Sequence, residues 1–193
     1  MKYLFIVVCC FLFITCNRER KQDPIQSTRI VPTSILFTAL DSSFTINLSS
    51  VFQQLKYAGR DTIQTVSGKA LEDSYVLDND SLSMIISIGK FDSKLISKRP
   101  DAKVFESAIN NFLHVLDAKK TKTMRCAKII DSVNITGERT LFTLKVKDSS
   151  FFGVSEMYRR DNTLHHLCII SSKKEDFTQS NDIALAFNSF MPR

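Results

Sequence analysis

Hydrophobic and polar positions alternate with a period of about two in the last third of the chain, over three successive runs. These runs, all rich in β-branched and aromatic residues, are Glu138–Lys147, Phe151–Arg160 and Thr163–Ser171. The breaks between them, Asp148–Ser150 and Asp161–Asn162, contain residues that favour turns because their side chains bond nearby backbone. We therefore expect neighbouring runs to pair as antiparallel hairpins.

Beyond Asp176 the hydrophobic period changes from two to about 3.6. Ile183, Phe187 and Phe190 then share one face of a helix. This pattern predicts a closing helix that packs its apolar face on the strands before it.

A longer helix is predicted for Asp101–Ala118. Its apolar residues recur every three to four positions, at Phe105, Ile109, Phe112 and Leu116. Asp101 can accept hydrogen bonds from the free N–H groups of the first turn, and Lys119 and Lys120 suit the negative end of the helix dipole.

Four strands are expected before this helix, and a fifth, Thr123–Asn134, follows it. The four, separated by turns at Ser67–Gly68 and Asp78–Ser81, are Phe44–Leu48, Asp61–Val66, Lys69–Leu77 and Leu82–Lys90. Ser34–Leu40 is apolar enough to be an edge strand or a plug against the core. We therefore predict one α+β domain over residues 34–193, with a mainly antiparallel sheet of about eight strands and two principal helices.

The N-terminus begins with a short basic start and an apolar run, Tyr3–Ile14, that is too short for a permanent membrane span. The run ends at Cys16, before a strongly polar segment, which is the arrangement of a bacterial lipoprotein signal. Residues 1–15 would be removed and Cys16 would carry the lipid. Cys9 and Cys10 lie inside the apolar run and fit this role less well. The alternative is an ordinary secretory signal that is cut nearby and leaves the exported protein without a lipid.

Residues 16–33 are polar, charged and interrupted by Pro24 and Pro32, as in a flexible tether. Lipidation at Cys16 would hold the protein on a membrane of the bacterial cell envelope, facing the periplasm or the exterior. The chain of 193 residues is 44% hydrophobic, which is enough for a core.

The net charge of +6 is distributed along the chain. Its local basic clusters include Arg18–Lys21, Lys119–Lys122 and Arg159–Arg160. This spread favours a solvated surface over a nucleic-acid or anionic-lipid footprint. The presence of 15 Phe and no Trp likewise favours burial of aromatic rings over stacking on exposed bases.

The order of elements and several local motifs resemble the PsbP family of the photosystem II oxygen-evolving complex. That fold also occurs in a Ran-binding nuclear protein and in many bacterial lipoproteins. The motifs, spread over most of the predicted domain, are Phe44–Ile46, Gly68–Tyr75, Gly137–Arg139, Asp161–Leu164 and Phe187–Phe190. The chain departs from the family at Ala186, where an aromatic residue is usual. The resemblance implies an α-β-α sandwich and no catalytic activity, and nothing in it indicates a photosynthetic role.

The histidines and cysteines suggest a metal site or a disulfide only weakly. His165 and His166 are consecutive on a predicted strand, so they must point to opposite faces. His114 could bind a cation with residues one and two helical turns earlier, although a solvated helix face is the simpler interpretation. Cys126 and Cys168 fall on strands that a simple meander separates by two others, so we expect buried free thiols and no disulfide.

Acidic pairs at Glu72–Asp73, Asp78/Asp80 and Glu175–Asp176 are expected at turns or strand ends, where they are solvated. The segment around Asp78 resembles a calcium loop but lacks its glycine and distal glutamate. Gly153-Val154-Ser155 does not complete a nucleophile elbow, because Met157 replaces the second glycine.

The sequence thus favours a membrane-anchored exported lipoprotein with a non-catalytic binding or assembly role and no cofactor. Its partner would be an envelope protein and not a nucleic acid. The alternative is a cell-envelope hydrolase, or a small-ligand or metal-binding protein with an unrecognised site. A Ser-His-Asp triad assembled from distant residues belongs to this alternative.

Overall fold

The computed structural model describes residues 34–65, 68–79, 81–92 and 96–193. The predicted signal peptide, Cys16 and the tether lie outside the described residues, as do Val66, the last residue of a predicted strand, and Ser67 of the first predicted turn. Among the helices that the structure describes, none has the length and hydrophobicity that crossing a membrane requires.

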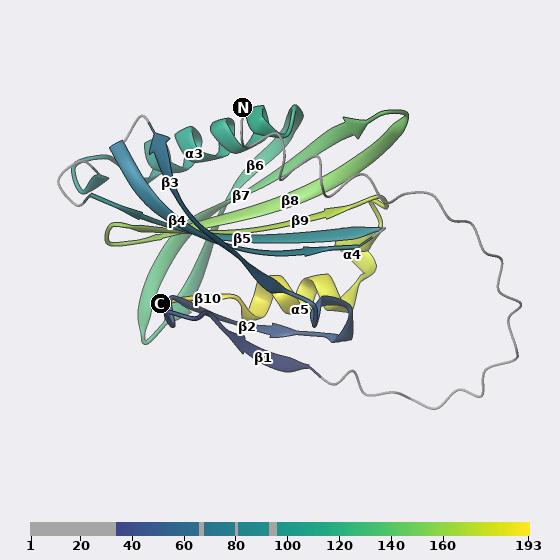
Figure 1. The fold of residues 1–193 in the computed structure, drawn as a ribbon, viewed down its shortest axis with the longest axis horizontal. Helices are drawn as coiled ribbons and strands as arrows, with labels where there is room; N and C mark the ends of the chain where they lie inside the picture. Colours follow the sequence, from purple (N-terminus) through teal and green to yellow (C-terminus); the bar gives the residue numbers. More distant parts are fainter. Residues whose placement is uncertain (1–33, 66–67, 80, 93–95) are drawn as a thin grey trace, which may run out of the picture. The chain divides into compact units, whose positions relative to one another are not determined.

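Seven strands form one antiparallel sheet in the order β3-β4-β5-β9-β8-β7-β6 (Figure 1). Their bounds are β3 Lys56–Thr65, β4 Gly68–Asp78, β5 Leu82–Phe91, β6 Ala118–Ile130, β7 Val133–Val146, β8 Ser149–Arg160 and β9 Thr163–Ser171. The predicted hairpins β7-β8 and β8-β9 are confirmed. Strand β9 also pairs with β5, so the meander joins the strands that precede the long helix.

A second sheet has the order β1-β2-β10 and is made of β1 (Ile35–Thr38), β2 (Phe44–Leu48) and β10 (Met191–Pro192). The α+β class and the mainly antiparallel sheet are therefore confirmed, and the strands are divided between a sheet of seven and a sheet of three. The first predicted strand, Phe44–Leu48, belongs to this smaller sheet. Ser34–Leu40 was expected to be an edge strand or a plug, and it contains the edge strand β1. Strand β2 is buried along almost its whole length, because residues on both of its faces are covered.

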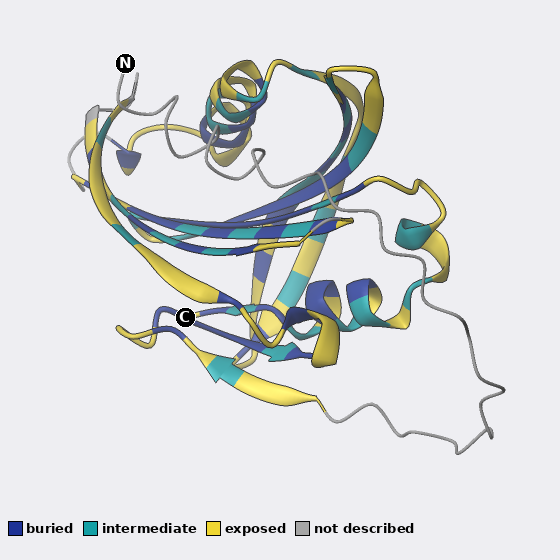
Figure 2. Cartoon of the chain, turned by 45° about the vertical axis from the view of Figure 1, so that its right-hand side comes forward, coloured by how far each residue is buried: buried dark blue, intermediate teal, exposed yellow. Residues whose placement is uncertain are grey.

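Helices cover both faces of the large sheet. Helix α3 (Asp101–Val115) lies on one face, whereas α5 (Asn181–Ser189) and the small sheet lie on the other (Figure 2). The short elements η1 (Ser50–Phe52) and α4 (Asp176–Gln179) complete the described helices. The long strands between these layers are buried along much of their length, which is the sandwich that the resemblance implied.

The long helix differs from its prediction at both ends. Pro100 occupies the N-cap position, and the carboxylate of Asp101 accepts a hydrogen bond from Arg159 Nη1 at 2.7 Å instead of capping the first turn. At the other end the chain reverses at Asp117, whose φ is +51°, and β6 begins at once. Lys119 and Lys120 therefore belong to β6 and not to the last turn of the helix.

Strands β6 and β7 form one long hairpin instead of the separate segments that the sequence suggested. Asp131 and Ser132 form its two-residue turn, with φ of +51° and +66°. The expected strand Thr123–Asn134 was wrong because it ran through this turn. Positive φ at both central residues matches the twist of the flanking strands, so the turn is compatible with a hairpin even without glycine.

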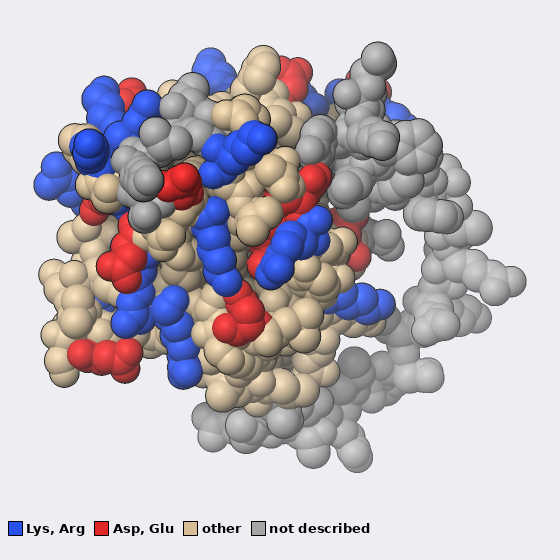
Figure 3. Space-filling view, turned by 60° about the vertical axis from the view of Figure 1, so that its left-hand side comes forward, with Lys and Arg blue, Asp and Glu red and all other residues tan. Residues whose placement is uncertain are grey.

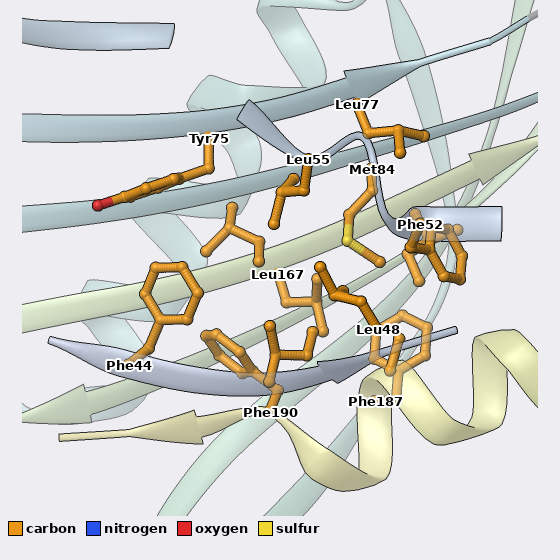
Figure 4. Close-up of a cluster of buried hydrophobic side chains, with 14 of the residues drawn as sticks. Phe44, Leu48, Phe52, Leu55, Tyr75, Leu77, Met84, Leu167, Phe187 and Phe190 are labelled. Atoms are coloured by element: carbon orange, nitrogen blue, oxygen red, sulfur yellow. The ribbon is translucent and has the colours of Figure 1, made fainter. Parts of the chain in front are cut away.

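Two apolar clusters fill the space on either side of the large sheet. The first, between the two sheets, contains Phe44, Phe52, Tyr75, Phe187 and Phe190 among its largest side chains (Figure 4). The second lies beneath α3 and is built around Phe105, Ile109, Leu113, Phe142 and Met157. The closing helix thus buries the face that its periodicity indicated.

Candidate functional site

A row of residues crosses the large sheet on the face that looks toward the small sheet. Strand register places these residues opposite one another in turn, in the order Arg60, Asp73, Ile88, His165, Tyr158, Gly137, Cys126. A buried carboxylate lies near each end of this row. Asp73 is part of the row and lies at the β3-β4 end, whereas Glu156 lies in the adjacent row at the β6-β8 end.

Asp73 is 4% exposed, and three donors bind its carboxylate. The hydroxyl of Tyr57 donates at 2.9 Å, and Arg60 donates from Nε and Nη2 at 2.8 Å each. The hydrogen bonds from Arg60 hold the pKa of Asp73 below its usual range. A buried charge that is paired and hydrogen-bonded in this way is tolerated inside a fold.

A β-bulge in β3 makes this arrangement possible. Tyr57 and Arg60 are three positions apart and would point to opposite faces of a regular strand. The bulge between Tyr57 and Gly59 adds one residue and brings both side chains to the face of Asp73. Gly59 has a φ of +134°, a conformation that other residues rarely adopt.

A pocket of about 60 Å³ opens beside this cluster, where the β1-β2 turn meets the large sheet. It is lined by Leu40, Asp41, Tyr57, Arg60, Asp73 and Tyr75. The hydroxyl of Tyr75 points away from the apolar cluster, and it accepts a hydrogen bond from the backbone N–H of Leu40 at 3.0 Å (Figure 4). Polar groups from two strands, β3 and β4, and from a turn therefore converge on one small space.

Asp41 forms the second ion pair at this pocket. Its carboxylate accepts from Lys90 Nζ at 2.5 Å and from the backbone N–H of Ser43 at 3.0 Å. Burial alone would raise the pKa of Asp41, but these hydrogen bonds outweigh it and lower the pKa to about 2.

Glu156, at the other end of the sheet, repeats the same pattern. It is 1% exposed and accepts from Arg139 Nε at 2.7 Å, from Arg139 Nη2, and from the hydroxyl of Tyr158 at 2.7 Å. The Arg139 guanidinium also lies 5.4 Å from the centroid of the Phe187 ring. Each buried carboxylate is thus held by one arginine and one tyrosine.

Lys128 and Cys126 border the Glu156 cluster on β6. Lys128 Nζ donates to the carbonyl oxygen of Phe187 and lies 5.4 Å from the ring centroid of Tyr158. Burial lowers the pKa of Lys128 and raises the pKa of the Cys126 thiol. A thiol with a raised pKa is a poor nucleophile, so this cluster fastens β6 and α5 together and offers no activated thiolate.

A serine-histidine pair lies on the opposite face of the sheet, beneath α3. Ser155 Oγ and His166 Nε2 are 2.7 Å apart, and the ring of Phe112 packs edge-on against His166 with centroids 4.6 Å apart. Burial lowers the pKa of His166 to about 4. Ser155 is 1% exposed and His166 is 6% exposed, so substrate cannot reach the pair while α3 is in place.

The other histidines do not form a metal site with these groups. His165 faces the small sheet, where its Nε2 lies 3.1 Å from the carbonyl oxygen of Ser43, so the prediction that His165 and His166 point to opposite faces is confirmed. His114 is exposed on α3, and its helical neighbours Glu106 and Asn110 are bound to lysines. No group of three or more His, Cys, Asp or Glu that could hold a metal occurs among the described residues.

Cys126 and Cys168 are both free thiols. They lie on β6 and β9, with β7 and β8 between them, as the meander predicted. They also belong to different apolar clusters, Cys126 beside the first and Cys168 within the second. Cys168 is buried as expected, whereas Cys126 is only partly buried.

Two expectations about charged residues are wrong. Glu72 and Asp73 lie within β4 and not at a strand end, and Asp73 is buried. Arg159 is not a free surface cation: its side chain is 11% exposed and donates to Asp101 and to the carbonyl oxygens of Ile96 and Arg99. The acidic position Asp78 does lie at the end of β4, as predicted.

No protein-family model matches the chain, and no curated protein sequence matches it. The solution structure of cyanobacterial PsbP (CyanoP) from Synechocystis sp. PCC 6803 matches it with a TM-score of 0.53 and 10% identity, over 89% of this chain and 100% of that one. This chain has a PsbP-like fold. A protein of unknown function from Pseudomonas aeruginosa matches with a TM-score of 0.44 and 10% identity, over 83% of this chain and 97% of that one. The likeness to CyanoP shows the fold, and at 10% identity no activity follows from it.

Proposed function

We propose that this PsbP-like domain is a non-catalytic binding or assembly module, exported and held at the bacterial cell envelope by a lipid on Cys16. The anchor is supported by the position of Cys16 between an apolar run and a polar tether. The tether would give the domain reach from the membrane without fixing its orientation.

The observation that carries the non-catalytic role is the state of the groups that catalysis would need. The serine-histidine pair is enclosed beneath α3, and burial lowers the pKa of its histidine. The two buried carboxylates are neutralised by arginines, so neither is a free acid or base. Among the described residues, a small polar pocket opens at the surface.

The surface favours a protein partner over a nucleic acid. On the face shown in Figure 3, acidic and basic side chains are interspersed. A nucleic-acid footprint would concentrate positive charge on one element. Mixed charge is compatible with an envelope protein that presents both signs.

The anchor is tested by replacing Cys16 with alanine. Cys16→Ala should leave the protein unprocessed or move it from the detergent phase to the soluble fraction. The double variant Cys9→Ala/Cys10→Ala is the matched control and should partition like the wild type. Equal partitioning of the wild type and Cys16→Ala would show that Cys16 carries no anchor.

The binding role is tested against the hydrolase alternative, which the 2.7 Å contact between Ser155 and His166 favours. The protein should give no turnover on a panel of ester and amide substrates, and crosslinking in its own membranes should recover one partner reproducibly. Turnover that Ser155→Ala abolishes without lowering the melting temperature would establish the hydrolase instead.

A further inference from the structure

We propose that the pocket beside Asp73 binds a primary carboxamide, the group carried by asparagine, by glutamine and by small free amides. This inference rests on the proposed binding role and names the chemistry that the accessible site would recognise. Three properties of the pocket carry it: its size, its charge and its remaining hydrogen-bonding capacity.

The size restricts the ligand to a small group. The pocket volume is about 60 Å³. A water molecule needs roughly 10–15 Å³ by this measure, so the space equals that of about four to six waters. A carboxamide with its adjoining carbon has about this number of non-hydrogen atoms. A longer ligand would leave its remainder outside, where Leu40 is 78% exposed and Tyr57 is 41% exposed.

The charges at the pocket cancel in two ion pairs. Arg60 pairs with Asp73, and Lys90 pairs with Asp41. A lone carboxylate would meet two carboxylates in the pocket wall, and a lone ammonium would compete with two cations already in place. A neutral group with a strong dipole avoids both penalties.

The lining still offers both donors and acceptors. Arg60 uses Nε and one Nη2 hydrogen on Asp73, which leaves the rest of its five N–H donors. The hydroxyl of Tyr75 accepts from Leu40 and keeps its own proton for donation. The carboxylates of Asp73 and Asp41 retain lone pairs for an N–H donor. A carboxamide satisfies both needs, since its carbonyl oxygen accepts and its NH₂ group donates.

The experiment compares two isosteric probes, acetamide and acetate, by ligand-observed saturation-transfer NMR on the full-length protein in detergent. Acetamide should give the stronger transfer, with binding in the millimolar range. Tyr75→Phe removes a donor and should weaken acetamide binding by about fivefold to tenfold. Tyr158→Phe is the matched control, because it removes a tyrosine hydroxyl from the carboxylate cluster at the opposite end of the sheet.

A change of preference gives the sharper test. Asp41→Asn removes one negative charge and leaves Lys90 unpaired, so the preference should move from acetamide toward acetate. Stronger binding of acetate than of acetamide to the wild type overturns the proposal. So does acetamide binding that neither Tyr75→Phe nor Asp41→Asn changes.

Two further probes separate the sources of the group. Preference for free glutamine over N-acetyl-glutamine methylamide indicates a small-molecule ligand, and the reverse preference indicates a side chain of a partner protein. The proposed function is contradicted by different results, namely turnover that depends on Ser155, or membrane partitioning that is the same with and without Cys16. Neither of those results alters the response of the pocket to acetamide.

Discussion

Glu156 depends on Arg139 more than Arg139 depends on Glu156. The side chain of Glu156 is 1% exposed, whereas that of Arg139 is 39% exposed and can reach water if its partner is removed. Arg139→Ala leaves a buried carboxylate without its cation and should lower the free energy of unfolding by about 3–5 kcal/mol. Glu156→Gln should cost less, about 1–2 kcal/mol. Urea denaturation at neutral pH measures both, and a larger loss in Glu156→Gln would contradict this account.

Gly153 is required by packing across the strands, not by a nucleophile elbow. It pairs with Phe142 on β7, and a Cβ at this position would lie 2.1 Å from the Phe142 ring. Because Phe142 is buried, its ring has little room to move, and Gly153→Ala should destabilise the protein by about 1–3 kcal/mol.

Gly89→Ala is the control for Gly153→Ala, because its Cβ would lie 3.3 Å from the edge of the Phe91 ring. We expect it to cost less than half as much. Equal melting temperatures for the wild type and Gly153→Ala would contradict the packing argument.

The alternation of side chains along a strand predicted the orientation of some residues and could have predicted the burial of others. The opposite orientations of His165 and His166 follow from the period of two alone. The same rule places Glu156 on the inward face with Val154 and Tyr158, which is a readable sign of a buried carboxylate. The rule also places Asp73 on the face of Tyr75 and Leu77, but its donors Tyr57 and Arg60 carried no such sign, because the bulge at Gly59 interrupts the alternation of β3.

Arg159 fastens the start of α3 to the β8-β9 turn. Its guanidinium donates to the Asp101 carboxylate and to the carbonyl oxygens of Ile96, Arg99 and Asp161. Arg159→Ala should lower stability by about 1–3 kcal/mol and increase hydrogen exchange in the first turn of the helix. Arg160→Ala is the neighbouring control and should change exchange there far less. Unchanged protection in Arg159→Ala would show that the helix start is held by packing alone.

The hydrophobic period of the sequence predicted which segments form helices or strands better than it predicted where these elements begin and end. Helix α3 ends at Val115 because Asp117 adopts a positive φ, which the continuing apolar pattern does not reveal. The turn at Asp131 and Ser132 contains no glycine, so the usual sign of a two-residue hairpin was missing. The β8-β9 turn was predictable because Asp161 and Asn162 are residues that favour turns.

The arrangement of the two sheets depends on contacts between distant parts of the chain. Strand β2 pairs with β10 at the C-terminus, and β9 enters the sheet beside β5. No local signal fixes such pairings, since the cost of closing long loops is repaid only when the whole core forms. The resemblance to PsbP motifs indicated the fold class, and the pocket arises only where the β1-β2 turn reaches the large sheet.

The two buried histidines make the stability of the whole domain sensitive to mild acid. Burial lowers the pKa of His165 and of His166 from 6.5 to about 4 in each case. The unfolded chain, with ordinary histidines, therefore takes up protons first as the pH falls below about 6.5. The free energy of unfolding is highest above this pH and should fall between about pH 6.5 and pH 4, by up to about 3 kcal/mol for each histidine.

Asp41 acts in a lower pH window, because its pKa is lowered from 3.8 to about 2. Its contribution is present above about pH 4 and is lost as the pH falls toward 2; solvent screening of this partly exposed pair limits it to about 1 kcal/mol. Denaturation series from pH 7 to pH 3 on the wild type, His165→Gln and His166→Gln separate the two effects. Each histidine variant should flatten the profile between pH 6.5 and pH 4 and leave the decline below pH 4 in place. A wild-type profile that is level from pH 6.5 to pH 4 would mean that the folded protein accepts these protons without cost, and that the histidines are less enclosed than their positions between the sheets and beneath α3 require.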